Sequence, residues 1–350
     1  MSHYERRLEA DIASIRAEVL SIGAAAEKGV ERSIRALLND DDSEAYAVVL
    51  EDLPINRRVR ALDKRCHGFV ARHLPSAGPL RFISSVLRLN IALERIGDYA
   101  VSIARQATVL GTDLPLEVQR LLISMDEQAR LMLRQSMTAF AEGDAGLARG
   151  TKSMAGTIDA GLHNAYNMLV AMGEEKGSSE VRDLFGLLTV FARLERVSDQ
   201  AKNICEEAIF TATGATKPPK VYKVLFLERA HNNWGHLAEH MARKAFPGSG
   251  AYDSAGWAPA STLAPSLLPQ AEQLGLELGE AQPQSVDDLF HPLADYHVIV
   301  CLGDSEGCPE IPFYTSLLKW TLPEDTQQAA RELSAHIADL MQLMRGDDAP

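Results

Sequence analysis

Two pairs of acidic residues have the spacing that a metal-binding helix face requires. Glu94 and Asp98 are four residues apart, and Glu195 and Asp199 repeat that spacing. On a helix, positions i and i+4 share a face, so each pair presents two carboxylates side by side. Two negative charges this close repel each other unless they are well solvated or a cation lies between them.

An arginine follows the glutamate in both pairs and offers a second interpretation. Arg95 and Arg196 are the cations that a purely structural pair would use, and solvated Glu-Arg helix faces are common. Hard oxygen ligands from neighbouring helices are instead how helical bundles hold iron, manganese or magnesium. The recurrence of the arrangement favours a function, but both interpretations stay open at this point.

The stretch KVLFLERAHNNWGHLAEHM (223–241) has the outline of a phosphate-binding loop. An apolar strand, residues 224–227, runs into a short polar loop, and a helix pattern begins near Gly235. Such loops aim backbone N–H groups and a helix N-terminus at an anion. Here the loop opens with Glu228, a negative charge where the anion would bind, so we expect it to repel an oxyanion.

The first 212 residues carry long helical patterns, with apolar residues at three- and four-residue intervals and almost no strand signal. The segment LERIGDYAVSIARQA (93–107) returns as LERVSDQAKNICEEA (194–208), and such internal repeats determine the whole fold. The sequence predicts two stacked three-helix bundles, over residues 4–110 and 116–212. Breaks between the six helices are expected at residues 39–45, 73–80, 110–115, 141–146 and 173–179.

Residues 213–220, with a glycine and two prolines, are typical of a linker. Short strand patterns then alternate with helices over residues 221–350, which is typical of a parallel sheet in an α/β domain. The predicted fold class is therefore multidomain: all-α tandem three-helix bundles followed by an α/β domain. Its strands are expected at 221–227, 251–255, 296–302 and 316–321, and its helices at 235–246, 264–275 and 325–345.

Composition limits the kinds of partner. The chain of 350 residues is long enough for two domains with cores of their own. A formal net charge of −13 argues against nucleic acid or anionic lipid as the main partner. No apolar stretch approaches the roughly 20 residues that cross a bilayer, and four cysteines fit a reducing compartment. We expect a cytoplasmic protein without an integral membrane segment.

The acidic segments resemble the paired signature helices of the PhoU family, the phosphate-uptake regulators. ALERIGDYAVSIA (92–104) and RLERVSDQAKNIC (193–205) carry the repeated Glu-x-x-x-Asp motif. Upstream, NRRVRALDKRCHGFVARHLPSAGPLR (56–81) resembles the family's preceding helix and turn. The resemblance covers about residues 4–212 and implies tandem three-helix bundles whose acidic motifs bind metal.

The same resemblance implies site residues and partners. The metal residues correspond to Asp63, Glu94 and Asp98 in repeat one, and to Asp159, Glu195 and Asp199 in repeat two. The identity of the metal stays open among iron, manganese, magnesium and zinc. Pro79 stands where the family usually has an acidic residue, so the first site is expected to be the weaker. The implied partners are the ATPase of the phosphate ABC transporter and the phosphate sensor kinase, and a homodimer stays open.

VLFLERAHNNWGHLAE (224–239) resembles the phosphate loop of low-molecular-weight tyrosine phosphatases and thioredoxin-coupled arsenate reductases, and YDSAGW (252–257) resembles their second strand and turn. This resemblance spans about 221–345. Glu228 stands at the nucleophilic cysteine, Trp234 at the phosphate-gripping arginine and Gly235 at the serine after it. Because the chemistry needs a thiolate and an arginine fork, we expect a degenerate loop in a pseudoenzyme.

Cys301 and Cys308 lie in DYHVIVCLGDSEGCPEIP (295–312), which resembles the reductase segment with the second and third redox cysteines. The resemblance makes them a candidate redox pair. The alternative is a buried strand-end cysteine with a leftover loop cysteine, because no first cysteine is present to start a relay.

Together these features predict a cytosolic regulator of phosphate uptake and phosphate signalling. It would act through metal-bound helical bundles and protein–protein contacts, at the membrane periphery when a transporter holds it. One alternative is an arsenate reductase or protein phosphatase with a non-standard active site. Another is a metal- or redox-responsive interaction protein unrelated to phosphate.

Overall fold

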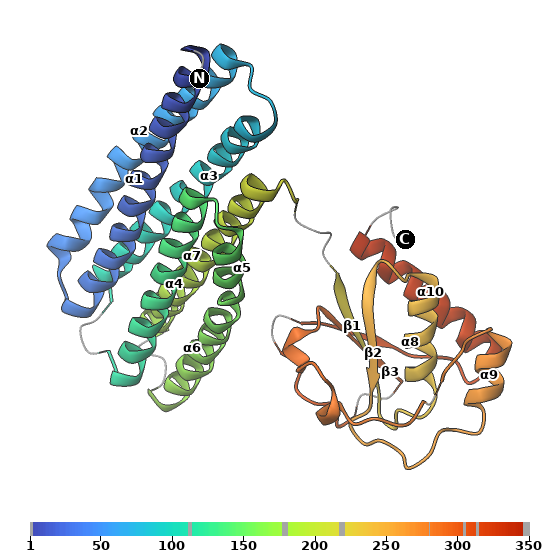
Figure 1. Ribbon diagram of the computed structural model, residues 1–350. Helices are drawn as coiled ribbons and strands as arrows, with labels where there is room; N and C mark the ends of the chain where they lie inside the picture. Colours follow the sequence, from blue (N-terminus) through green and yellow to red (C-terminus); the bar gives the residue numbers. More distant parts are fainter. Residues whose placement is uncertain are drawn as a thin grey trace. The chain divides into compact units, whose positions relative to one another are not determined.

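The structure is a computed structural model that describes residues 3–110, 114–176, 181–216, 221–279, 281–303, 306–312 and 315–345. It divides into two compact units, residues 1–217 and 218–350 (Figure 1). The first unit is helical and the second contains a sheet, as the sequence predicts. None of the described helices is long and apolar enough to cross a membrane.

The helical unit consists of two bundles. In the first, α1, α2 and α3 pack against one another, and in the second, α4, α5 and α6 pack against α7. Contacts of α3 with α7 and of α1 with α4 join the two bundles, so the tandem arrangement is confirmed. The helices are α1 (His3–Asn39), α2 (Asp42–His73), α3 (Ala77–Ala107), α4 (Leu116–Glu142), α5 (Ala145–Ser153), α6 (Ala155–Lys176) and α7 (Val181–Thr213).

Helix ends in this unit fall where turn residues satisfy free backbone groups. The side chain of Asp41 caps α2 by accepting a hydrogen bond from the N–H of Glu44 at 2.9 Å. Gly143 ends α4 with φ of 69°, in the left-handed region that glycine adopts without a Cβ clash. Asp144 then caps α5 by accepting hydrogen bonds from two N–H groups. The predicted breaks at 39–45 and 141–146 are therefore confirmed.

The described part of the helical unit has seven helices instead of six because the middle helix of repeat two is divided. Between α5 and α6 the N–H of Met154 bonds to the carbonyl of Thr151, and the N–H of Thr157 bonds to the carbonyl of Met154. These i to i+3 bonds interrupt the α-helical pattern. Gly150 and Gly156 flank the break, and each glycine costs a helix about 1 kcal/mol relative to alanine.

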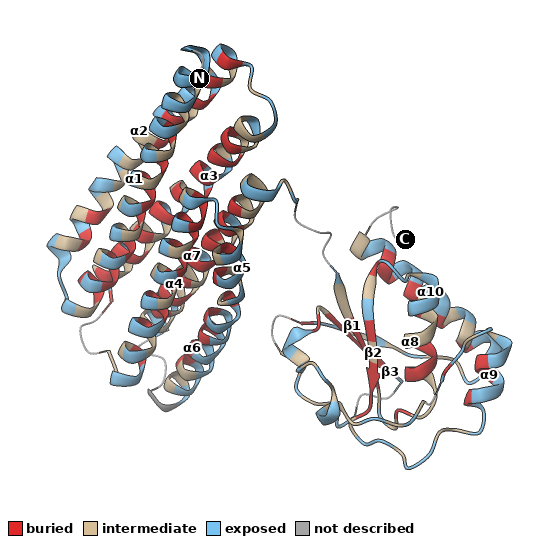
Figure 2. Ribbon diagram, viewed as in Figure 1, coloured by how far each residue is buried: buried red, intermediate tan, exposed pale blue. Residues whose placement is uncertain are grey.

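The core of the helical unit runs between the helices along their apolar faces. Buried residues lie on the helix sides that face one another, and exposed residues cover the outside (Figure 2). Leu93 and Leu194, next to the two acidic pairs, are fully buried. The glutamate that follows each leucine is thereby held at the edge of the core.

The second unit is a four-stranded parallel sheet in the order β2-β1-β3-β4. Leu227 of β1 pairs with Ala255 of β2 on one side and with Cys301 of β3 on the other. The elements are β1 (Tyr222–Glu228), α8 (Trp234–Ala245), β2 (Gly250–Ala255), α9 (Leu267–Gln273), η2 (Val286–Asp288), η3 (Leu293–Asp295), β3 (Val298–Leu302), β4 (Ser316–Trp320) and α10 (Thr326–Arg345).

The two faces of this sheet are covered differently. Val224 and Phe226 point into a core made with α8, α9 and α10, which lie on one side of the sheet in Figure 1. Leu225 and Leu227 point to the opposite face, where the segments around η2 and η3 cover them. Because side chains alternate along a strand, β1 is buried on both faces, as is usual for a central parallel strand.

Candidate functional site

The first acidic pair lies on α3 and is joined by a carboxyl group from α2. The charge of Asp52 interacts with those of Asp98 and Glu94. Burial raises the pKa of Asp52, the charge of Asp98 raises it further, and a hydrogen bond that Asn56 donates at 2.6 Å opposes the shift. Atom Oδ1 of Asp52 is buried without a hydrogen-bond partner. The cluster therefore holds an unsatisfied acceptor, which a cation or a water molecule would satisfy.

Asp63, the third residue that the resemblance implies for repeat one, lies further along α2. Its Oδ1 accepts a hydrogen bond from the side chain of Asn90 at 2.7 Å. Asn90 is buried and lies on α3, one helical turn before Glu94. The structure thus places Asp63 beside Asn90 and brings Asp52 to the acidic pair. Sequence reasoning missed Asp52, although residues 52, 56 and 63 have the spacing of a single helix face.

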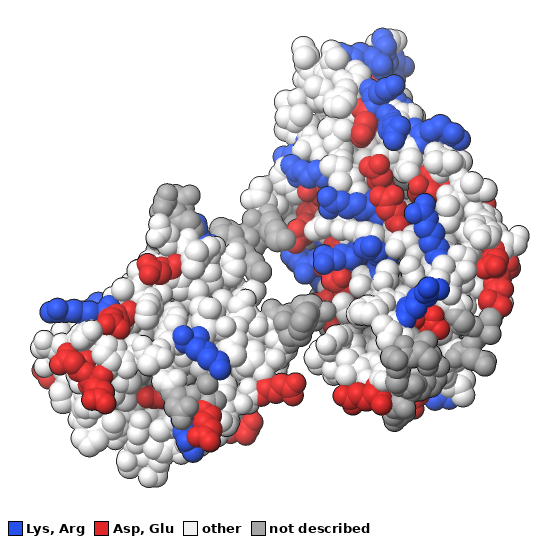
Figure 3. Space-filling model, turned by 180° about the vertical axis from the view of Figure 1, so that it is seen from behind, with Lys and Arg blue, Asp and Glu red and all other residues white. Residues whose placement is uncertain are grey.

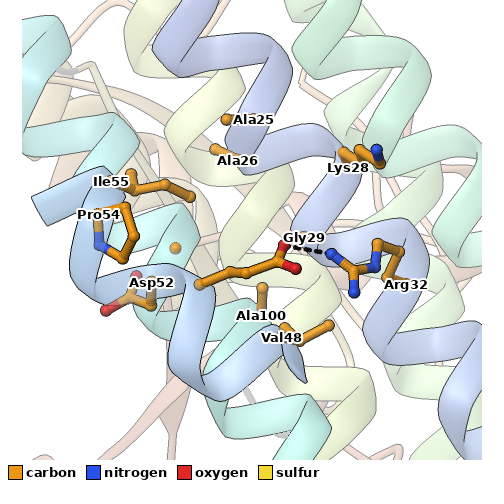
Figure 4. A pocket seen from close by; sticks show the side chains of 12 residues that line it. Ala25, Ala26, Lys28, Gly29, Arg32, Val48, Asp52, Pro54, Ile55 and Ala100 are labelled. Atoms are coloured by element: carbon orange, nitrogen blue, oxygen red, sulfur yellow. Dashed lines mark hydrogen bonds and ion pairs between the residues drawn. The ribbon is translucent and has the colours of Figure 1, made fainter. Parts of the chain in front are cut away.

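A cavity of about 210 Å³ opens beside Asp52 between α1, α2 and α3. Figure 4 shows Asp52 and Pro54 of α2 on one side of it and Lys28 and Arg32 of α1 on the other. Arg32 forms an ion pair with Glu51, which also lines the cavity. The cavity therefore borders Asp52 of the first acidic cluster and carries charges of both signs.

The second acidic cluster brings Asp159 of α6 to Glu195 and Asp199 of α7. Glu195 is 16% exposed, and its burial, followed by the charge of Asp199, raises its pKa to about 7. The charge of Asp159 adds to this rise, and that of Arg196 opposes it. Partial loss of hydration, followed by the charge of Asp199, also raises the pKa of Asp159, although this residue is exposed, and the charge of Lys202 opposes the rise. The three residues that the resemblance implies for repeat two therefore interact electrostatically.

Arginine compensates the acidic charge in only one of the two described clusters. Arg196 lies 3.4 Å from Oε2 of Glu195 and 3.5 Å from Oδ2 of Asp199. Arg95 makes no ion pair with any residue that the structure describes. Oxygen donors suit hard cations, yet no group of three His, Cys, Asp or Glu in the described ranges has a geometry that could hold a metal ion. The donor chemistry fits a metal, but the carboxylates do not converge.

The segment that the sequence predicts to be a degenerate phosphate loop lies at the end of β1. Glu228 is the last residue of that strand, and Trp234 and Gly235 are the first two residues of α8. The carboxylate of Glu228 turns into the loop and accepts hydrogen bonds from backbone N–H groups at 3.1–3.3 Å. The carboxylate of Glu228 therefore satisfies the N–H groups that the sequence predicts to face an anion.

Two of the four cysteines lie together in the second unit. The Sγ atoms of Cys301, at the end of β3, and Cys308 are 3.2 Å apart, and both thiols are free. Burial, followed by the hydrogen bond between the two sulfurs, raises the pKa of Cys301 to about 12. Cys301 is fully buried, whereas Cys308 is partly exposed. The pair is close enough to join after a small movement, and Cys308 is its accessible member.

A family model of the PhoU domain matches residues 19–107 and 122–208, one match for each bundle. The chain belongs to the PhoU family. It is 34% identical over 217 residues to the phosphate-specific transport system accessory protein PhoU homologue of Pseudomonas putida, covering 61% of this chain and 83% of that one. A homologue from Pseudomonas aeruginosa is 31% identical over 240 residues, covering 67% of this chain and 96% of that one.

Solved structures confirm the fold of the PhoU part. The crystal structure of PhoU from Pseudomonas aeruginosa aligns with 59% of this chain and 99% of its own, with a TM-score of 0.57 and 30% identity. The second unit has a weak structural similarity to an arsenate reductase in the phosphate-binding state, with a TM-score of 0.31 and 18% identity over 35% of this chain. A likeness at that level does not identify what the second unit does.

Proposed function

We propose that this protein regulates phosphate uptake and phosphate signalling from the cytoplasm. The observation that carries the proposal is the PhoU match over both bundles, together with relatives named as accessory proteins of phosphate-specific transport. The alignments with this chain cover 83% and 96% of the two relatives, so most of each relative's length has a counterpart here.

The proposed partners are the ATPase of a phosphate ABC transporter, a phosphate sensor kinase, or both. Binding to the transporter would place the protein at the membrane periphery. On the face of the helical unit shown in Figure 3, basic side chains are dense and acidic side chains lie between them. A surface that carries both signs of charge favours one alignment of the partner, because in other alignments like charges would face each other and repel.

We also propose that the two acidic clusters hold metal ions, which requires their carboxylates to move closer together than in this structure. Asp52, Glu94 and Asp98 would hold one ion, and Asp159, Glu195 and Asp199 would hold another. The metal would neutralise the clustered carboxylates and link helices α2 with α3 and α6 with α7. Support comes from the unpartnered Oδ1 of Asp52 and from the raised pKa of Glu195. The second site should bind more tightly, because Pro79 supplies no carboxylate to the first.

Metal content after mild purification tests this metal proposal. We expect the double variant Glu195→Ala/Asp199→Ala to lose at least half of the bound metal, because it removes the tighter site, as measured by elemental mass spectrometry on folded protein. The matched control Glu117→Ala/Glu127→Ala, on exposed positions of α4, should keep it. Equal metal content in the wild type and both variants would contradict the assignment.

For the second unit we propose a pseudoenzyme that serves as an accessory binding module. The positions that would carry a thiolate and an arginine hold Glu228 and Trp234, and fold alone does not dictate activity. A second candidate role, redox response, is favoured by the 3.2 Å distance between the sulfurs of Cys301 and Cys308. An arsenate reductase is disfavoured because its attacking cysteine has no counterpart at residue 228.

Affinity capture with the full chain tests the regulatory proposal. Tagged protein expressed in its own host at high phosphate should recover the transporter ATPase or the sensor kinase after reversible crosslinking. Charge reversal at exposed arginines of α2, as in Arg57→Glu with Arg60→Glu, should lower the recovery if the partner docks on this helix. Recovery of neither partner under high or low phosphate would oppose the proposal.

A further inference from the structure

Four consecutive backbone N–H groups point at one carboxylate in the second unit. Oε2 of Glu228 accepts hydrogen bonds from the N–H groups of Asn232 at 3.2 Å, Asn233 at 3.1 Å and Gly235 at 3.3 Å. Its Oε1 accepts one from the N–H of Trp234 at 3.2 Å. Consecutive N–H groups that converge in this way form an anion-binding concavity. The anion in this case is a side chain of the same loop.

The fold places this concavity where an α/β sheet binds its ligands. The chain leaves β1 toward β2 on one side and leaves β3 toward β4 on the other, so the strand order reverses between β1 and β3. The crevice at the carboxyl end of such a strand is the general ligand position in open parallel sheets. Glu228 is the carboxyl-terminal residue of β1. The glutamate therefore occupies the ligand position of the sheet.

Glu228 also replaces the usual cap of α8. The side chain of Asn233, the N-cap residue, makes no capping hydrogen bond, and its Oδ1 is buried without a partner. The first N–H groups of a helix need acceptors, and a negative charge there interacts favourably with the helix dipole. The carboxylate meets both requirements, since it accepts from the N–H groups of Trp234 and Gly235.

The loop around the carboxylate is fixed by a buried histidine. His231 has φ of 46°, an uncommon conformation for a residue with a side chain. Its Nδ1 accepts a hydrogen bond from the N–H of Gln284 at 2.7 Å, so Nε2 donates to Oγ of Ser254 at 2.8 Å. The Ser254 hydroxyl in turn donates to Glu239. This chain of bonds holds the loop backbone in place around Glu228.

Positive charge that could attract an external anion is scarce in this unit. Burial, followed by the charge of His236, lowers the pKa of His231 to about 3, so its imidazole is neutral at physiological pH. Residues 221–350 contain seven Lys and Arg against 18 Asp and Glu, a formal net charge of −11. Basic side chains are correspondingly sparse on the face of this unit in Figure 3. Long-range electrostatics thus oppose the approach of phosphate.

We propose that Glu228 is a built-in ligand of the phosphate loop. Its carboxylate substitutes for a bound oxyanion, keeps residues 232–235 in the occupied conformation and closes the site to phosphate and arsenate. The second unit therefore does not sense inorganic phosphate through this loop. It presents one fixed, anion-filled loop at all phosphate concentrations. This inference concerns the second unit alone and holds whether or not the helical unit docks on a transporter.

Phosphate binding by the full chain with Glu228→Ala tests the proposal. Hydrogen bonds to a charged group are among the stronger ones, so four freed N–H groups should raise phosphate affinity about tenfold or more over the wild type. Isothermal titration with inorganic phosphate should show saturable binding for Glu228→Ala only. The control Glu277→Ala removes an exposed acidic charge from the same unit and should behave as the wild type does.

Two results would overturn the proposal. One is saturable phosphate binding by the wild type that shifts the amide resonances of residues 232–235. The other is a folded Glu228→Ala variant that phosphate leaves unchanged. If Glu228→Ala does not fold, the wild type supplies the test: the amides of residues 232–235 should be protected from hydrogen exchange without phosphate, and added phosphate should not change that protection. Wild-type amides that exchange freely until phosphate is added would equally contradict a built-in carboxylate ligand.

Discussion

Oδ1 of Asp52 on α2 lies 2.7 Å from the position that a Cβ would take at Gly97 on α3. Real Cβ atoms essentially never approach an oxygen so closely, so the absence of a side chain at Gly97 lets Asp52 reach the first acidic cluster. The corresponding residue of the second repeat is Ser198, whose hydroxyl donates to the carbonyl of Glu195. The two repeats therefore build their acidic clusters differently.

Gly97→Ala should displace the Asp52 carboxylate without unfolding the bundle. Replacing glycine by alanine inside a helix normally stabilises it by about 0.5–1 kcal/mol. We expect that gain at Gly68, where an added Cβ would meet no other atom within 4 Å, but not at Gly97. Urea unfolding measures the free energy of unfolding of Gly97→Ala and of Gly68→Ala. A double-mutant cycle that combines Gly97→Ala with Asp52→Ala then isolates the contribution of the Asp52 carboxylate.

The missing stabilisation at Gly97 is attributed to the carboxylate of Asp52 alone. In the Asp52→Ala background, Gly97→Ala should recover the gain that Gly68→Ala shows. If Gly97→Ala stabilises the wild type as much as Gly68→Ala does, the close approach of Asp52 has no energetic consequence and this account of the first cluster fails.

Glu195→Gln should flatten the pH dependence of stability. The folded-state pKa of Glu195 is about 7, above its ordinary value of 4.5, so the folded chain holds this proton more tightly. The resulting stabilisation is fully present below pH 4.5 and is lost as pH rises through 7. Without metal, the wild type should lose up to about 3 kcal/mol more than the variant between pH 5 and pH 8.

Chelator must be present in that measurement, because a bound cation favours the ionised carboxylate and reverses the trend. The exposed Glu117→Gln on α4 serves as the control and should follow the wild type. If the free energy of unfolding of the wild type and of Glu195→Gln changed with pH in the same way, burial and the charges of Asp199 and Asp159 would not raise the pKa of Glu195, which contradicts this account of the second cluster.

Much of this architecture follows from local signals in the sequence. Asp41, Gly143 and Asp144 are turn and cap residues whose roles depend on immediate neighbours, so the helix breaks beside them were predictable. The repeat at residues 93–107 and 194–208 likewise indicated two bundles. Strand patterns placed all four strands of the second unit within two residues of their observed starts.

The candidate sites depend on contacts between residues that are far apart in the sequence or on how a side chain folds back, and local sequence patterns do not reveal either. The spacing of Glu94 and Asp98 revealed a shared face, but the partner Asp52 is known only once α2 packs against α3 with Gly97 at the contact. The glutamate at the end of β1 was expected to repel an anion. Its side chain instead folds back and accepts hydrogen bonds from the N–H groups of its own loop, which no spacing rule predicts.

Oxidation should join Cys301 to Cys308. Two thiols would give up two protons and two electrons to an added oxidant such as diamide, forming one disulfide. Peptide mass spectrometry after alkylation should show the two cysteines linked, while the fully buried Cys66 and Cys205 stay reduced. Cys308→Ser should abolish the linkage, and dithiothreitol should reverse it. Free alkylatable thiols at both positions after oxidation would rule out a redox pair.

The purified full chain should neither hydrolyse aryl phosphates nor reduce arsenate with thioredoxin. Glu228 offers no thiolate, and Trp234 cannot grip a tetrahedral oxyanion as arginine does. Glu228→Cys alone should stay inactive, because Trp234 still leaves the loop without an arginine to hold the oxyanion. Turnover by the wild type that disappears in Glu228→Ala or Cys301→Ser would instead favour an enzyme with a non-standard site.

Phosphate control in the organism's own cells tests the central proposal most directly. Expression of a phosphate-starvation reporter should be measured at high phosphate in a deletion strain complemented with the full chain. The account predicts high expression in the deletion strain and repression by the wild type and by Glu228→Cys. It also predicts weaker repression by Glu195→Ala/Asp199→Ala at equal protein level. Normal repression in the deletion strain, with unchanged phosphate uptake, would contradict a role in phosphate regulation.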